Sequence, residues 1–105
     1  MDQSRSMCNK ENKMNSYKFY SDAGHGWLEV DLKELVALGV ASAISRYSYI
    51  KRTETGTKVF LEEDCDVQVF DDAMKKRKID YACYHVDHGM DSPIRNYLRF
   101  HEGRV

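Results

Sequence analysis

The sequence predicts an α+β fold: a mainly antiparallel sheet of about five strands with two helices on one face, in the order ββα-ββα-β. Two observations support this prediction. A strand-like segment, a turn-rich segment and a second strand-like segment occur together twice, and helical spacing follows each time. One more strand-like run comes after the second helix. A sheet covered on one side leaves its other face available for function.

The first unit combines a hairpin with a short helix. Aromatic residues at 17–20 and a strand-like segment at 27–30 enclose turn residues, which indicates a hairpin. The helix is expected over 32–38. Asp31 can cap its start, and Gly39 suits the left-handed position that follows a helix end.

The second unit repeats this pattern. Strand-like segments at 46–51 and 58–62 flank a second turn. Asp64 or Asp66 can begin the next helix, which ends in the basic run 75–78, so its charges favour the helix dipole.

The two ends of the chain differ in character. Residues 81–86 are strand-like, whereas 93–100 fit either a short helix after Ser92 or a terminal strand. Residues 1–15 contain no aromatic or β-branched residue and are expected to form a disordered tail. The remaining residues, 16–105, are expected to form a single domain.

Composition excludes several classes of protein. The 105 residues carry 16 basic and 17 acidic side chains, so a net charge of −1 supports neither a cationic nucleic-acid binder nor an anionic DNA mimic. Three cysteines without a CxxC pair argue against a disulfide scaffold and favour a reducing cytoplasm. No run approaches the roughly 18 apolar residues that cross a bilayer. We expect a cytoplasmic protein that does not enter membranes.

Aromatic residues are the first candidates for a binding surface. Strand alternation places Trp27 opposite Leu28 and Val30, so it faces outward if those two face the helices, and puts Tyr47 and Tyr49 on one face. Exposed aromatic side chains suit contact with a protein, stacking of bases or pairing of two copies. The alternative is that tyrosine simply favours strands.

Histidines and acids are the second group of candidates. His25 lies between two glycines near Asp22, but no GxSxG, HExxH or phosphate-loop pattern accompanies it, so no catalytic residue is assigned. His85 and His88 lack the matching pair of a zinc site, so no metal or cofactor is assigned. An acidic segment can pair with a basic groove on a partner or favour a helix dipole; it comprises Glu62, Glu63, Asp64, Asp66, Asp71 and Asp72.

Several blocks of this sequence resemble a family of small proteins and domains carried by phages, plasmids and other bacterial mobile elements. They are YSDAGHGWLEV at 20–30, LG at 38–39, ISRYSY at 44–49, VFLEEDCD at 59–66 and SPIRNY at 92–97. The resemblance spans about residues 17–100. It implies a role against host defence, such as that of an anti-CRISPR protein, by occupying a surface of a nuclease or its guide complex. It implies no catalytic residues.

The predicted function is therefore non-enzymatic inhibition of a bacterial defence protein or ribonucleoprotein, such as a nuclease complex, by steric or charge-based blockade. The predicted contact residues are Asp22, His25, Trp27, Tyr47, Tyr49, Glu62, Glu63, Asp64 and Asp66. One alternative is a small metal-dependent or histidine-dependent enzyme. Another is a single-strand nucleic-acid module that stacks bases on its aromatic residues and uses Lys51, Arg52 and Lys58, although near-neutral charge disfavours direct nucleic-acid binding.

Overall fold

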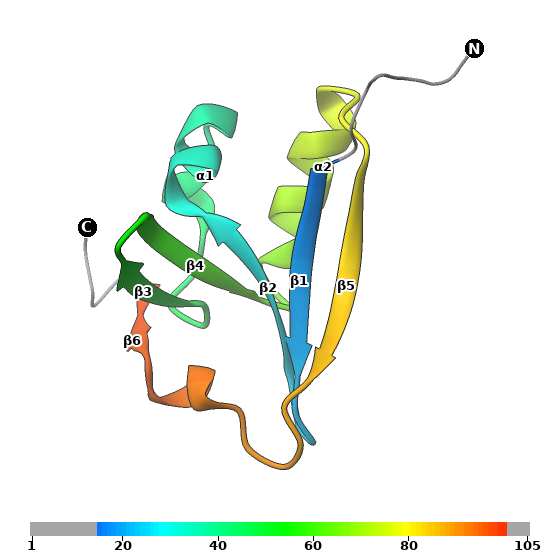
Figure 1. Cartoon of the computed structure of the whole chain (residues 1–105). Coiled ribbons are helices and arrows are strands. Elements are labelled where there is room, and N and C mark those ends of the chain that lie inside the picture. The colour runs from blue at the N-terminus through cyan, green and yellow to red at the C-terminus, as the bar shows by residue number, and fades with distance from the viewer. Residues whose placement is uncertain (1–14, 101–105) are drawn as a thin grey trace.

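The computed structural model describes residues 15–100 and shows an α+β fold with both helices on one face of a single sheet (Figure 1). The sheet has six strands in the order β5-β1-β2-β4-β3-β6. The elements in chain order are β1 (Asn15–Ser21), β2 (Gly26–Asp31), α1 (Leu32–Leu38), β3 (Tyr49–Thr53), β4 (Gly56–Glu62), α2 (Val67–Lys76), β5 (Tyr81–Asp87) and β6 (Leu98–Arg99), with short 3₁₀ helices at Ala41–Ala43 and Pro93–Asn96.

The sheet differs from the prediction in two ways. It contains a sixth strand, β6, which pairs antiparallel with β3. It is also mixed, because β5 runs parallel to β1. The cause is the connection through α2: β4 and β5 point the same way, and strands joined by a crossover helix run parallel.

The local predictions for the first unit are largely confirmed. β1 and β2 form the expected hairpin, and α1 covers the predicted residues. Gly39 has a φ of 77° and ends α1 in the left-handed conformation. The predicted cap was wrong, since the Asp31 side chain makes no capping hydrogen bond and pairs with Lys58 instead. β1 begins at Asn15, whereas residues 1–14 and 101–105 lie outside the described part of the chain.

The second unit forms the expected hairpin of β3 and β4, although β3 starts only at Tyr49. Asp66 immediately precedes α2, but its carboxylate accepts hydrogen bonds from the hydroxyl groups of Ser45 and Ser48 rather than capping the helix. The end of the chain combines both predicted alternatives. A 3₁₀ helix capped by the Ser92 hydroxyl is followed by β6.

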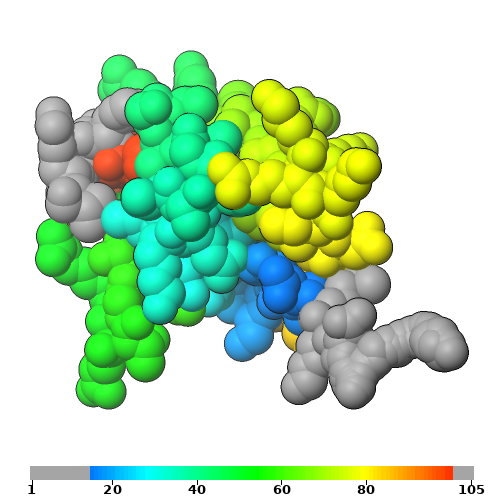
Figure 2. All heavy atoms as spheres, turned by 90° about the horizontal axis from the view of Figure 1, so that it is seen from above, coloured from blue at the N-terminus to red at the C-terminus, as the bar shows by residue number. Residues whose placement is uncertain are grey.

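The main core lies between the helices and the sheet. Figure 2, which views the molecule from the side of the helices, shows α1 and α2 next to each other. The buried apolar side chains of this core include Leu28, Val30, Val59 and Leu61 from the sheet, and Leu35, Phe70 and Met74 from the helices. Burial of apolar surface supplies most of the driving force for folding.

Strand alternation suggested that the opposite face of the sheet is open, but this face is covered. Trp27 is only 2% exposed and packs in a second cluster with Tyr49 and Phe60, closed by Ile94 from the segment before β6. Trp27 does point away from Leu28, as predicted, but a segment distant in sequence covers it. The described residues contain no helix long and apolar enough to cross a membrane.

Candidate functional site

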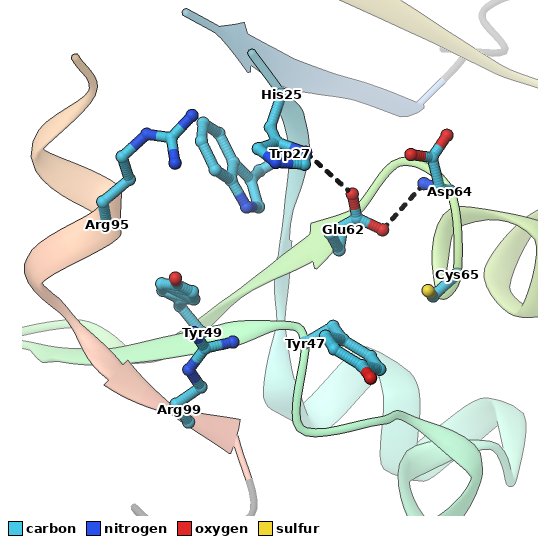
Figure 3. Close-up of a pocket in the computed structure, with 9 residues that line it drawn as sticks. All are labelled: His25, Trp27, Tyr47, Tyr49, Glu62, Asp64, Cys65, Arg95 and Arg99. Carbon is cyan, nitrogen blue, oxygen red and sulfur yellow. Dashed lines mark hydrogen bonds and ion pairs between the residues drawn. The ribbon is translucent and has the colours of Figure 1, made fainter.

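The register of the sheet builds a pocket beside this second cluster. Trp27 pairs with Glu62 across β2 and β4, and Tyr49 pairs with Arg99 across β3 and β6. Directly opposed residues project to the same face, so an indole, a carboxylate, a phenol and a guanidinium become neighbours. The pocket has a volume of about 330 Å³ and is lined by His25, Trp27, Tyr47, Tyr49, Glu62, Asp64, Cys65, Arg95 and Arg99 (Figure 3).

Acidic side chains and an imidazole meet at one end of the pocket. Glu62 ends β4 and is only 8% exposed. Its Oε1 accepts a hydrogen bond of 2.8 Å from the Asp64 backbone N–H, and its Oε2 lies 3.4 Å from His25 Nδ1 (Figure 3). The ligand atoms of His25, Glu62 and Asp64 lie within 4.8 Å of one another. These three residues could hold a metal ion.

Aromatic and cationic side chains form the other walls. The Arg95 guanidinium lies 5.4 Å from the Trp27 ring centroid, and that of Arg99 lies 4.9 Å from the Tyr49 ring. Both distances fit cation–π contacts. Tyr47, at 57% exposed, provides an accessible aromatic group. The pocket therefore offers opposite charges at its two ends and aromatic surface between them.

Asp22 was predicted to contact a partner, but its side chain is fully buried and connects two segments. Its carboxylate accepts two hydrogen bonds from Arg95, at 2.6 and 2.9 Å, and others from the backbone N–H groups of Gly24, His25 and Ser92. The Arg95 hydrogen bonds, followed by the backbone ones, hold the pKa of Asp22 well below its usual range. Asp22 thus positions both the turn that carries His25 and the segment that carries Arg95.

The structure sorts the nine predicted contact residues into three groups. Six line the pocket: His25, Trp27, Tyr47, Tyr49, Glu62 and Asp64. The Asp22 side chain is buried and Asp66 is only 2% exposed, so both carboxylates are used within the fold, although both residues were predicted to contact a partner. Glu63 is exposed next to Asp64. The acids therefore divide between those that hold the fold together and those that reach the pocket.

Three pocket residues were not predicted: Cys65, Arg95 and Arg99. The arginines reach the pocket through the covering segment and β6, and no local motif marks such long-range placement. Cys65 could have been found from its position between the acids of the segment 62–66. Desolvation, followed by hydrogen bonding to Glu62, raises the pKa of the Cys65 thiol, which disfavours a thiolate nucleophile.

His85 and His88 do not come together in one site. His85 Nε2 lies 2.9 Å from the Ser21 hydroxyl, and the ring packs on Phe19. His88 stacks on Tyr20, with 4.7 Å between ring centroids, and its Nδ1 contacts the Ser92 hydroxyl. Each imidazole thus has its own structural partners.

The nucleic-acid alternative loses its stacking platform in this structure. Trp27 and Tyr49 are buried, which leaves Tyr47 as the accessible ring of the predicted three. Lys58 pairs with Asp31, and Lys51 lies over the Tyr97 ring.

The chain gave no match to any protein-family model, curated protein or solved structure.

Proposed function

We propose that this chain is a non-enzymatic binding protein that inhibits a bacterial defence effector by blockade, with the pocket as its contact site. The observation that carries this proposal is the Glu62 carboxylate, which is almost buried yet faces the pocket beside the exposed Asp64. A buried carboxylate is unfavourable unless a cation or hydrogen-bond donors compensate for its lost hydration. A basic side chain of a partner would supply that compensation.

The pocket suits a single lysine or arginine side chain. Its volume of about 330 Å³ lies at the lower end of the range for ligand pockets, roughly 300–1,000 Å³. An inserted guanidinium or ammonium would meet Glu62 and Asp64 and could lie against the Tyr47 ring. Anchors of this kind, desolvated and surrounded by weaker contacts, contribute most of the binding energy at protein interfaces.

A defence nuclease or its guide complex fits these requirements. Surfaces that hold nucleic acid are rich in lysine and arginine, because they neutralise phosphates. The exposed acids Glu63 and Asp64 would compete with phosphates for such a surface, and the bulk of the domain would obstruct it. The resemblance to mobile-element proteins favours this class of partner.

The proposal is tested by affinity capture from lysates of bacteria with active defence nucleases, followed by direct binding to the purified complex that is captured. Asp64→Lys should weaken binding roughly tenfold or more, because like charges that face each other across an interface cost several kcal/mol. Asp80→Lys is the matched control, since Asp80 is also exposed but does not line the pocket.

A second matched pair tests the aromatic contact. Tyr47→Ala should weaken binding, whereas Tyr84→Ala should not, because the two tyrosines are 57% and 59% exposed and Tyr47 alone of the pair lines the pocket. Equal binding and equal inhibition by all four variants would eliminate the pocket as the contact site.

A further inference from the structure

We propose that His25, Glu62 and Asp64 form a binding site for one divalent transition-metal ion, with Zn²⁺ the best match to the donors. Imidazole and carboxylate groups are both zinc ligands, whereas Mg²⁺ and Ca²⁺ prefer oxygen donors alone. The inference concerns the same carboxylates as the proposed function, but it is argued from the geometry of this end of the pocket and does not require that the chain inhibits a defence effector.

The distance between two of the donors matches a metal site better than a hydrogen bond. His25 Nδ1 and Glu62 Oε2 are 3.4 Å apart, whereas a charge-assisted N–H···O bond is about 2.7–2.9 Å long. With metal–ligand bonds of about 2.0–2.1 Å in a tetrahedral arrangement, two ligand atoms lie about 3.3–3.4 Å apart. One ion can therefore bind both atoms at their observed separation.

The polypeptide fixes the two inner ligands. Glu62 Oε2 faces His25, while Oε1 of the same carboxylate holds the Asp64 backbone N–H at 2.8 Å. The turn that carries His25 is held by the buried Asp22, which accepts the His25 backbone N–H at 3.0 Å. Metal sites characteristically contain groups that hydrogen-bond to the ligand residues and hold them in position.

Asp64 supplies the third ligand from the exposed side. All the ligand atoms lie within 4.8 Å, and the Asp64 side chain is exposed, so a rotation about its own bonds can bring it onto the ion. Three protein ligands would leave a fourth coordination position facing the pocket, where water or a group from another molecule could bind. This arrangement is that of an open zinc site rather than a closed structural one.

The test is calorimetric titration of the tag-free full chain with ZnCl₂ after removal of bound metal by a chelator. We expect one ion per chain. His25→Ala and Glu62→Gln should each weaken the affinity tenfold or more, as loss of a ligand or its support commonly does. Glu63→Gln is the control, because Glu63 is an adjacent acid outside the group of three.

A second readout locates the ion. Trp27 is the only tryptophan, and its ring centroid lies 6.1 Å from that of His25. Titration with Co²⁺, which quenches nearby indoles, should lower its fluorescence in the wild-type chain and in Glu63→Gln but not in His25→Ala.

Three results would overturn the proposal: no zinc binding, unchanged affinity in both ligand variants, or no quenching by Co²⁺. Far-UV circular dichroism checks that each variant folds. If Glu62→Gln fails to fold, His25→Ala still tests the proposal, because the His25 side chain is 47% exposed and its loss should leave the fold intact. A wild-type chain that binds no zinc but still captures its protein partner would refute the metal site alone.

Discussion

Replacement of Trp27 by alanine is expected to lower the free energy of unfolding by about 4–5 kcal/mol. The indole is 2% exposed, so the substitution removes nearly all of its buried area. Roughly 200 Å² at about 25 cal/mol per Å² corresponds to about 5 kcal/mol, near the top of the usual range for such truncations. The cation–π contact with Arg95, worth about 0.5–1 kcal/mol, is included in this expected loss.

The assay is urea denaturation followed by far-UV circular dichroism, because Trp27 is the only tryptophan and its loss removes the fluorescence signal. Tyr47→Ala is the control and should change stability by no more than about 0.5 kcal/mol, as exposed positions usually do. A loss below about 1 kcal/mol for Trp27→Ala would refute the conclusion that the segment before β6 covers this face. Trp27 variants are therefore unsuitable as probes of the interface, since weakened binding would report unfolding.

Two further predictions concern the first residue of β2 and the turn before that strand. Gly26→Ala should destabilise the domain by about 1–3 kcal/mol, because the added Cβ would lie 2.5 Å from the Phe19 ring and 2.8 Å from Glu63 Oε1; an unchanged melting temperature would show that the ring moves aside freely. Asp22, whose pKa is lowered chiefly by Arg95, stabilises the folded state above the unfolded-state pKa of about 4, and this contribution is lost as pH falls. Stability should therefore fall less steeply below about pH 4 in Asp22→Asn than in the wild type, and parallel profiles would contradict this role.

The sequence predicted the elements whose causes are local. Gly39 marked the end of α1 because the left-handed conformation at that position is a property of one residue and its immediate neighbours. The cap at Asp31 was predicted wrongly because Lys58 faces it from β4 and takes its carboxylate. Pairing across strands thus decided between two uses of one side chain.

The parts of the fold that were missed depend on long-range contacts. Alternation along β2 indicated which face Trp27 occupies, but not that Ile94, far along the chain, would cover it. Likewise, the strand-like run at 81–86 does not indicate which strand it pairs with in the sheet. The parallel direction of β5 followed from the crossover through α2, which only the assembled sheet reveals.

The candidate site shows the same division. The acidic residues are visible in the sequence, but partners far along the chain decide what each of them does. Asp22 accepts hydrogen bonds from Arg95, 73 residues away, and Asp66 accepts them from Ser45 and Ser48. Glu62 and Asp64 reach the pocket because β4 pairs with β2 and ends there. Composition could therefore predict an acidic segment but not which of its members face a ligand.

Glu62 is the residue on which both proposals converge, and His25 is the one that separates them. A carboxylate so nearly buried, with an imidazole 3.4 Å away, gains from any cation that enters the pocket, whether an ion or a partner's basic side chain. A metal ion needs the imidazole as a neutral donor. A basic side chain does not need the imidazole. His25→Ala should therefore weaken zinc binding tenfold or more while protein capture is retained, whereas Glu62→Gln should weaken both.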